Sequence, residues 1–277
     1  MRDFIARPEH GIVWISGASS GIGRALALKL AGEGYKVAVT ARSHEKLVEL
    51  QAEVSGLSGS IVVLDGDVTD AEDMEHAMAS IEYEHGTLAM AILNADLCLP
   101  VHAEDLNRAD FERTFAVNLS GVVNCLLPAI RHMKAKGQGQ IAIISSVAGY
   151  GGVPTGAAYG ATKAALINMA ESLKFDLDKM GIRIQLVSPG FVDMPAMRKN
   201  ALLTAEPLSP DEAARQIAAG LKSQAFEIAF PKRFTTMMKL ARLLPYSAYF
   251  ALVNRVTGWR ERPSLTDHHP VTPHPAE

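Results

Sequence analysis

The feature that most constrains the fold is a regular alternation of short apolar runs with longer segments of helical spacing. The apolar runs have the length of strands and are continuous, which indicates strands that are buried on both faces. The segments between them repeat apolar residues every three or four positions, as Ile22, Leu26 and Leu30 do, and this spacing predicts helices. The predicted strands cover residues 12–16, 36–40, 60–64, 88–93, 140–145, 183–188 and 226–230, and the predicted helices cover 21–33, 44–54, 70–84, 108–136, 157–179 and 210–222.

Strands and helices that alternate in this way form a parallel sheet with helices on both faces. We therefore predict an α/β fold with a doubly wound, Rossmann-like parallel sheet of about seven strands. No linker or repeat interrupts residues 1–231, so we treat them as one domain, followed by a helical extension at 232–262. Residues 263–277 are rich in proline and lack an apolar period, and we expect a disordered tail. Its histidines are interpreted as solvated, and no metal site is predicted.

Composition narrows the class of protein. The chain has 277 residues, 48% of them hydrophobic, and a net charge of -3. This balance is typical of a soluble globular domain, and it lacks the basic field of a nucleic-acid-binding protein. Two cysteines do not make a disulfide framework, the N-terminus lacks the apolar segment of a secretory signal, and no run of 18 apolar residues predicts a spanning helix. We expect a cytoplasmic protein without a nucleic-acid partner.

A glycine-rich turn follows the first predicted strand and opens the first predicted helix. Residues 16–23 read SGASSGIG, and the glycines permit a tight turn and a close approach to the backbone. The free N–H groups and positive dipole of the helix N-terminus suit a pyrophosphate. The spacing differs from GxGxxG, so a glycine turn without a ligand is the alternative. The candidate cofactor-binding residues of this turn are Gly17, Ser19, Ser20, Gly21, Ile22 and Gly23.

The same turn also matches GxSxG, the nucleophile elbow of α/β-hydrolases, with Ser19 as the nucleophile. That fold needs an oxyanion loop after an earlier strand, and only one predicted strand precedes Ser19. No convincing acid and histidine pair follows in the required order. The sequence therefore strongly disfavours a hydrolase.

The end of the second predicted strand indicates which dinucleotide binds. NAD-binding units place a carboxylate there, about 20 residues after the glycines, to bind the ribose 2′-hydroxyl. This chain has Ala41 and Arg42 instead, and a guanidinium suits a 2′-phosphate by charge and geometry. We predict NADP(H), with a merely solvent-exposed Arg42 as the alternative. Asp67 and Val68 close the third strand, where the adenine is expected.

Three polar residues predict the chemistry. Tyr159 and Lys163 lie four residues apart on one helix face, and Ser146 ends the fifth strand, thirteen residues before Tyr159. Reduction of a ketone needs a hydride from nicotinamide and a proton for the developing alkoxide. A tyrosine hydroxyl can give that proton, and a nearby Lys163 ammonium is expected to lower the pKa of Tyr159. Ser146 is expected to hold the carbonyl oxygen.

The combined pattern resembles the short-chain dehydrogenase/reductase family over about residues 10–230, in motifs that occur in the family's order. The resemblance implies that Tyr159 is the acid/base, that Lys163 binds the nicotinamide ribose and tunes Tyr159, and that Ser146 orients the substrate. It also implies that Asn118 holds a water connecting Lys163 to solvent. The residues and motifs that carry the resemblance are SGASSGIG, Asp67-Val68, Asn94-Ala95, Asn118, Ser146, YGATK and Ser188-Pro189-Gly190, and Asn94, Ala95, Pro189, Gly190 and Val192 join the predicted cofactor-binding residues.

The resemblance implies an NADP(H)-dependent oxidoreductase for a ketone or secondary alcohol, assembled as a homodimer or homotetramer. The competing class is a non-catalytic nucleotide-binding or membrane-associated protein that kept the fold. Three residues depart from the family pattern, because Ser16 replaces a threonine, Asp96 a glycine and Met194 a threonine. Asp96 adds bulk and charge near the expected nicotinamide ribose, so we expect it to crowd or repel the cofactor. We expect the loop 191–207 to act as a mobile lid over the substrate.

The segment 232–262 lies outside the family's common core and combines basic with apolar residues. Pro245 divides it into two amphipathic stretches, and Glu261 is its one acidic residue. Such helices can lie on anionic membranes, but most amphipathic helices pack on protein. We favour docking on the core, on a subunit or at the substrate pocket, and keep peripheral contact with the inner membrane face as the alternative. In either case we expect the segment to favour an apolar, lipid-like substrate.

Overall fold

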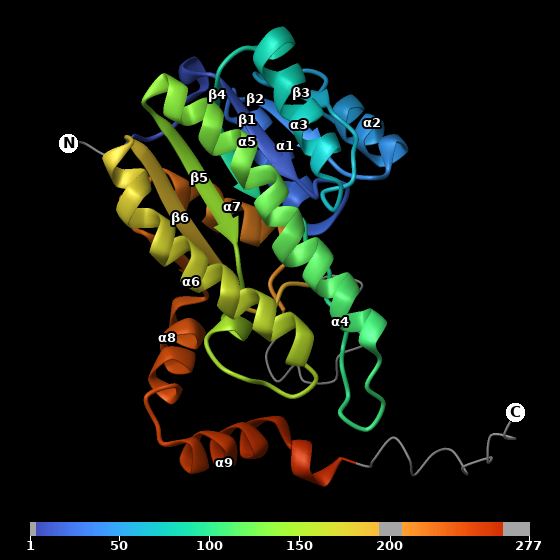
Figure 1. Ribbon diagram of the computed structural model, residues 1–277, viewed down its shortest axis with the longest axis vertical. Coiled ribbons are helices and arrows are strands. Elements are labelled where there is room, and N and C mark those ends of the chain that lie inside the picture. Colours follow the sequence, from blue (N-terminus) through green and yellow to red (C-terminus); the bar gives the residue numbers. More distant parts are fainter. Residues whose placement is uncertain (1–3, 194–206, 263–277) are drawn as a thin grey trace, which may run out of the picture.

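The structure is a computed structural model that describes residues 4–193 and 207–262 (Figure 1). Within these residues seven parallel strands form one sheet, in the order β3-β2-β1-β4-β5-β6-β7. The predicted Rossmann-like sheet is confirmed, and every strand boundary lies within one residue of its predicted position. The strands are β1 (Ile12–Ser16), β2 (Lys36–Thr40), β3 (Ser60–Val63), β4 (Leu88–Leu93), β5 (Gly139–Ile144), β6 (Ile182–Pro189) and β7 (Glu227–Phe230).

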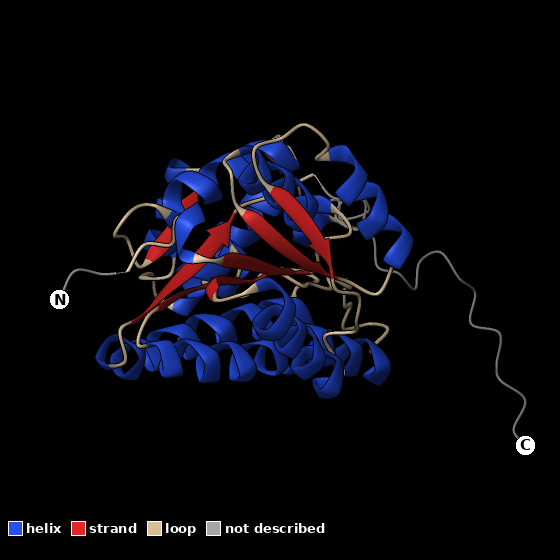
Figure 2. Ribbon diagram, turned by 90° about the horizontal axis from the view of Figure 1, so that it is seen from above, coloured by secondary structure: helices blue, strands red, loops and turns tan. Residues whose placement is uncertain are grey.

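Helices cover both faces of the sheet (Figure 2). Side chains of β1 show the two cores, because Val13 and Ile15 pack with one helix layer and Ile12 and Trp14 with the other. Both strand faces are therefore apolar, which is why the strands read as continuous apolar runs. The first layer contains α1 (Gly21–Gly32), α2 (His44–Glu53) and α7 (Pro210–Leu221), and the second contains α3 (Ala71–Ser80), α5 (Gly121–Lys136) and α6 (Ala157–Lys179).

The predicted helix 108–136 is present but contains a local change of winding. It consists of α4 (Arg108–Phe115), a π-helical turn at Ala116–Ser120, and α5. By length and composition this helix could cross a membrane, yet 44% of its most apolar stretch is buried and α5 packs against β4 and α3. It is therefore a core helix of the sheet. The π turn inserts a residue into the helical ladder, and such turns often occur at functional sites.

The sheet contains a switch point between β1 and β4. The chain leaves β1 toward β2 on one side and leaves β4 toward β5 on the other. The two connections diverge, which opens a crevice beyond the carboxyl ends of these strands, where open α/β sheets bind their ligands. The glycine turn follows β1 and Asn94 follows β4, so both lie at this crevice.

Two helices follow the last strand and lie beyond the carboxyl ends of the sheet (Figure 1). They are α8 (Lys232–Ala241) and α9 (Tyr246–Thr257), and Pro245 separates them as predicted. Tyr249 of α9 is buried and donates a hydrogen bond to the carbonyl oxygen of Gly152 at 2.9 Å. The extension therefore docks on the rest of the chain. The predicted disordered tail, Met194 and most of the predicted lid lie outside the described residues.

Candidate active site

The glycine turn is packed too closely for side chains at two positions. Gly17 has a φ of +70°, and a Cβ at this residue would come within 2.6 Å of the Ala95 Cα. A Cβ on Gly23 would come within 2.4 Å of the Gly17 carbonyl oxygen. The side chain of Ser20 makes no capping hydrogen bond at the start of α1. The first N–H groups of α1 are therefore available to a phosphate.

Ser16 and Asn94 fix this turn against the end of β4. The Ser16 hydroxyl accepts hydrogen bonds from the backbone N–H of Asn94 at 3.0 Å and of Ala95 at 3.2 Å. The Asn94 amide donates to the carbonyl oxygens of Ser16 and Gly17, each at 3.0 Å. Ser16, which stands where the family has a threonine, thus supplies a hydroxyl that accepts both bonds. Asn94 and Ala95 act by holding β1 and β4 together at the switch point.

A groove of about 100 Å³ with mixed polar and apolar walls follows the carboxyl ends of the strands. Its floor is the glycine turn, its walls come from the ends of β4, β5 and β6, and it reaches the predicted catalytic residues. The open N-terminus of α1 and the turn that tolerates no Cβ fit a dinucleotide in this groove. The predicted cofactor-binding residues that line it are Gly17, Ser20, Gly21, Ile22, Asn94, Tyr159, Pro189, Gly190 and Val192.

The residues predicted to bind the adenosine half of the cofactor are less closely grouped than those of the glycine turn. The side chain of Arg42 is 78% exposed and lies 3.9 Å from the Asp67 carboxylate. An exposed pair of this length is weak, so the guanidinium can turn to another anion. Asp67 also accepts two hydrogen bonds from Thr69, each of 2.9 Å. Val68 is buried, and the Asn124 amide donates to its carbonyl oxygen, so its side chain contributes to packing rather than to an open surface.

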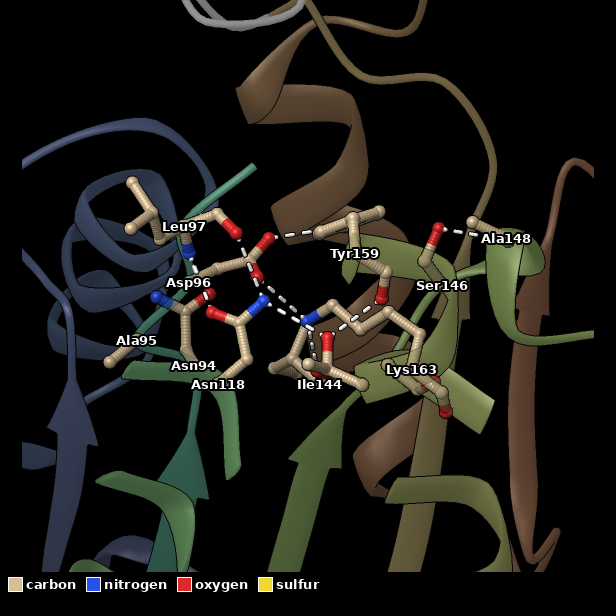
Figure 3. Close-up of polar contacts among 12 residues, drawn as sticks. Asn94, Ala95, Asp96, Leu97, Asn118, Ile144, Ser146, Ala148, Tyr159 and Lys163 are labelled. Carbon is tan, nitrogen blue, oxygen red and sulfur yellow. Dashed lines mark hydrogen bonds and ion pairs between the residues drawn. The ribbon is translucent and has the colours of Figure 1, made fainter. Parts of the chain in front are cut away.

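The predicted catalytic residues converge at the end of the groove (Figure 3). Ser146 follows β5, Tyr159 and Lys163 lie near the start of α6, and Asn118 comes from the π turn. Tyr159 is 7% exposed and Lys163 is 1% exposed. The Lys163 ammonium donates to the Ile144 carbonyl oxygen at 3.1 Å and lies 5.3 Å from the centre of the Tyr159 ring. The spacing of four residues therefore brings both side chains together as predicted.

Asn118 holds a loop. Its Oδ1 accepts from the backbone N–H of Leu97 at 2.8 Å, and its Nδ2 donates to the Leu97 carbonyl oxygen at 3.0 Å and to the Thr162 hydroxyl at 3.1 Å. The side chain is fully buried. Asn118 therefore fixes the loop after β4 against α6, and its contact with a water beside Lys163 stays a prediction.

Asp96 belongs to the catalytic group although the sequence analysis did not place it there. Its Oδ1 lies 2.9 Å from the Lys163 ammonium, and the Tyr159 hydroxyl donates to its Oδ2 at 3.1 Å (Figure 3). Its side chain is 21% exposed. The expected crowding of the cofactor stays a prediction, but Asp96 also has a direct contact with both catalytic side chains. The departure from glycine, directly after Asn94-Ala95, was the signal for this role.

The pKa of Tyr159 is raised well above its usual value. Burial is the largest cause, the negative charge of Asp96 is the next, and a hydrogen bond with Ser146 lowers the pKa in part. The direction of this shift is opposite to the lowering expected from Lys163, because burial and then the charge of the Asp96 carboxylate, which contacts both groups, raise the pKa of Tyr159. Tyr159 is therefore protonated at neutral pH, as a proton donor must be.

An apolar cavity of about 140 Å³ opens on the other side of the catalytic group. Ser146, Tyr159 and Gly190 are the residues that it shares with the groove. A ligand in the cavity and a ligand in the groove would thus meet at Ser146 and Tyr159. Sequence reasoning assigned the segment 232–262 to this region but not its individual residues. Those that line the cavity are Phe234, Met237, Met238, Ala241, Tyr249, Leu252, Val253, Val256 and Thr257.

Fold and site together define a nucleotide-binding oxidoreductase of the Rossmann type. The family model for short chain dehydrogenases matches residues 11–205, and the chain belongs to this family. This membership, and the position of Ser19 directly after β1, argue against the hydrolase alternative. Nicotinamide cofactors are used by this family, which acts on small molecules.

Named relatives agree with this assignment. An uncharacterized oxidoreductase from Myxococcus xanthus is 28% identical over 252 residues, which are 91% of this chain and 100% of the relative. A 3-oxoacyl-(acyl-carrier-protein) reductase from Staphylococcus aureus is 34% identical over 64% of this chain and 73% of its own length. The crystal structure of a 3-ketoacyl-ACP reductase from Sinorhizobium meliloti has a TM-score of 0.70 and 28% identity, and covers 79% of this chain and 96% of that protein.

Proposed function

We propose that this protein is an NADP(H)-dependent oxidoreductase that reduces an apolar ketone or oxidises the corresponding secondary alcohol. The observation that carries the proposal is the meeting of two different cavities at Ser146 and Tyr159. The groove, with its glycine turn and the open N-terminus of α1, suits a dinucleotide, and the apolar cavity suits the substrate. A substrate carbonyl placed where the cavities meet would lie beside both hydroxyl groups.

The chain's own residues can perform the proton chemistry. The glycine turn and the N-terminus of α1 would hold the pyrophosphate, and Gly190 and Val192 would border the nicotinamide. The bound cofactor supplies or accepts the hydride. Tyr159, which burial keeps protonated, donates its proton to the developing alkoxide, and the Ser146 hydroxyl donates a hydrogen bond to the same oxygen. The apolar walls of the cavity exclude water from these steps.

The substrate class follows from the walls of the cavity. Those from α8 and α9 are almost wholly apolar, with methionines that can adapt to an irregular or flexible chain. Two of the similar proteins are named as reductases of 3-oxoacyl groups on acyl carrier protein. We therefore propose a lipid-like ketone, such as one with an alkyl or acyl chain.

An activity screen tests this function. NADPH oxidation is measured with aliphatic, steroid and acyl-thioester ketones, and each series includes members of increasing apolar length. The proposal expects turnover that improves with apolar length, because every buried CH₂ contributes about 0.8 kcal/mol. Tight binding of NADPH without turnover of any ketone would favour the competing non-catalytic function.

Arg42 carries the proposed preference for NADP(H). A charge-assisted hydrogen bond is worth ~1.5–3 kcal/mol, so Arg42→Ala should weaken NADPH binding by ~10–100-fold. The affinity for NADH should change little, because NADH has no 2′-phosphate. Fluorescence titration with both cofactors measures the two affinities. Tighter binding of NADH than of NADPH by the unchanged protein would contradict this reading.

The outer face of α8 and α9 supports a peripheral contact with a membrane. Apolar side chains are exposed along it, with Leu243 at 81% and Tyr246 at 64%. Basic residues of the same segment would complement anionic lipid headgroups. We propose that the enzyme works in the cytoplasm and takes its apolar substrate at the inner membrane face. The exposed apolar residues of this segment that do not line the cavity are Leu240, Leu243, Leu244, Tyr246 and Phe250, and its exposed basic residues include Lys232, Arg233, Arg242, Arg255 and Arg260.

Co-sedimentation with vesicles measures this contact. The protein should bind anionic vesicles more strongly than neutral ones, and binding should weaken with salt, since each basic residue near the surface contributes about 1 kcal/mol. Leu243→Glu combined with Tyr246→Glu should remove most of the binding and leave turnover of a water-soluble ketone unchanged. Equal, negligible binding by both proteins would refute the membrane proposal.

Exposed apolar side chains on the long helices support a proposal of self-association. Leu127 on α5 is 57% exposed and Phe175 on α6 is 76% exposed, although both are large apolar side chains. Covering them with a second copy would remove apolar surface from water. We propose a homodimer or homotetramer that uses these helices, and light scattering on the purified protein distinguishes the two.

A further inference from the structure

We propose that Asp96 is a positioning residue that holds Tyr159 in its proton-donating form and so biases the enzyme toward carbonyl reduction. The proposal deepens the function given above, because it rests on Tyr159 as the acid/base. In this proposal the negative charge of Asp96 counteracts the effect of the Lys163 ammonium on the ionisation of Tyr159.

The carboxylate binds both catalytic side chains at once. One oxygen lies 2.9 Å from the Lys163 ammonium, and the other accepts a hydrogen bond of 3.1 Å from the Tyr159 hydroxyl. Lys163 is 1% exposed and the Asp96 side chain is 21% exposed, so water screens this pair far less than it screens a surface pair. A carboxylate accepts hydrogen bonds and cannot donate them, so the Tyr159 hydroxyl must keep its proton to make this contact.

The loop after β4 is built to hold the carboxylate in this place. The residue before it, Ala95, is fixed through its N–H to the Ser16 hydroxyl at 3.2 Å. The residue after it, Leu97, is fixed on both sides of its own backbone by the buried amide of Asn118, at 2.8 and 3.0 Å. Asp96 thus lies between two anchored neighbours. The π turn that carries Asn118 therefore acts on the catalytic tyrosine through Asp96.

The charges of Lys163 and Asp96 have opposite effects on the ionisation of Tyr159. An ammonium near a phenol favours the phenolate, whereas a carboxylate in contact with the phenol favours the neutral hydroxyl. The charge of Asp96 opposes the effect of Lys163 on the pKa of Tyr159. Asp96 also accepts a hydrogen bond from the Tyr159 hydroxyl. Cys98 adds no negative charge near neutral pH, because burial raises the pKa of its thiol to about 12. The groups that face Tyr159 are Asp96 and Cys98 from the loop after β4, Ser146 from the loop after β5, Lys163 from α6, and Tyr249 of α9 across the cavity.

The same charge balance separates the two directions of the reaction. In reduction, the O–H bond of Tyr159 breaks and the new O–H bond of the alcohol forms. The resulting phenolate faces a carboxylate, and this contact favours the return of a proton that restores the donor. Alcohol oxidation requires the phenolate before the reaction starts, so it needs a higher pH when Asp96 is present.

A titration of the free protein tests the proposal without any turnover. Tyrosinate absorbance is followed against pH for the unchanged protein and for Asp96→Asn, and the signal of the matching Tyr159→Phe variant is subtracted from each. The asparagine keeps the size of the side chain and removes its charge. The ionisation of Tyr159 should move down by at least about one pH unit, which is a tenfold larger ionisation constant. The exposed carboxylate of Asp105, on the same loop, supplies the control Asp105→Asn, which should leave this ionisation in place.

The pH profile of alcohol oxidation gives a second readout. In Asp96→Asn the rising limb of kcat/KM should move to lower pH by the same amount as the titration, and it should not move in Asp105→Asn. If Tyr159 ionises in Asp96→Asn but not in the unchanged protein before it unfolds, the proposal is supported. An unshifted Tyr159 ionisation, or none in either protein, overturns it. Full turnover by Tyr159→Phe would instead overturn the proposed function and leave the titration result standing.

Discussion

Tyr159→Phe is expected to lower kcat for carbonyl reduction by at least about 100-fold, the usual contribution of a positioned general acid. The Tyr159 hydroxyl is the proposed proton donor, and its side chain lines both the groove and the cavity. Phenylalanine fills the same space without the hydroxyl. The neighbouring Ser146 hydroxyl can still bind the carbonyl oxygen, so some turnover should remain. Steady-state rates of NADPH oxidation with a ketone found in the screen measure the loss.

NADPH affinity separates a chemical loss from a structural one. Tyr159→Phe should bind NADPH within a few-fold of the unchanged protein, because the glycine turn and the N-terminus of α1 carry most of the contacts with the phosphates. Tyr83 is 86% exposed and distant in sequence from the site, so Tyr83→Phe is a control that should keep full turnover. A rate for Tyr159→Phe within a few-fold of the unchanged enzyme would remove Tyr159 from the mechanism.

The fold could be predicted because both faces of the sheet are buried. Residues such as Val13 and Trp14 point to opposite faces and are both apolar, so each strand is marked along its whole length. The π turn at 116–120 could not be predicted in this way, since one inserted residue barely changes the spacing of apolar residues on a long helix. The position of this turn is important for the site, because the turn places Asn118 against the loop after β4.

The site could be predicted where local spacing determines it. Tyr159 and Lys163 share a helix face at a spacing of four residues, and Ser146 follows a strand that points to the same edge of the sheet. The contacts of Asp96 depend instead on the path of a loop, which Asn118 fixes from 21 positions further along the chain. Burial of Tyr159 and the carboxylate that this path brings to it both raise its pKa, so the direction of the shift could not be obtained from Lys163 alone.

The sequence predicted that the C-terminal extension forms two helices, but not which of their residues line the apolar cavity. Amphipathic spacing and Pro245 give the helices, whereas the residues that face the cavity depend on how α9 is anchored. Tyr249 provides the anchor through its bond to the Gly152 carbonyl. A Cβ on Gly151 would come within 2.6 Å of the Tyr249 hydroxyl, so a glycine there makes room for it. This contact anchors the helix whose residues line the cavity.

Val253→Trp is therefore expected to lower kcat/KM for long apolar ketones by at least about 100-fold. Val253 lines the cavity from α9, and the anchor at Tyr249 prevents the helix from moving away, so an indole there occupies space that the substrate needs. Excluding about four CH₂ groups at ~0.8 kcal/mol each costs ~3 kcal/mol, or ~200-fold. Short ketones should lose much less, because they need only the end of the cavity near Ser146.

Three comparisons show whether the loss arises in the cavity. NADPH affinity should be unchanged, because Val253 lines the cavity and not the groove. Ala251→Trp places the same side chain on an exposed position of α9 and should leave kcat/KM for long ketones near that of the unchanged enzyme. Val253→Ala should accept long ketones at least as well as the unchanged protein does. Equal losses for short and long ketones in Val253→Trp would mean that α9 does not bound the substrate, and the lipid-like substrate would lose its structural support.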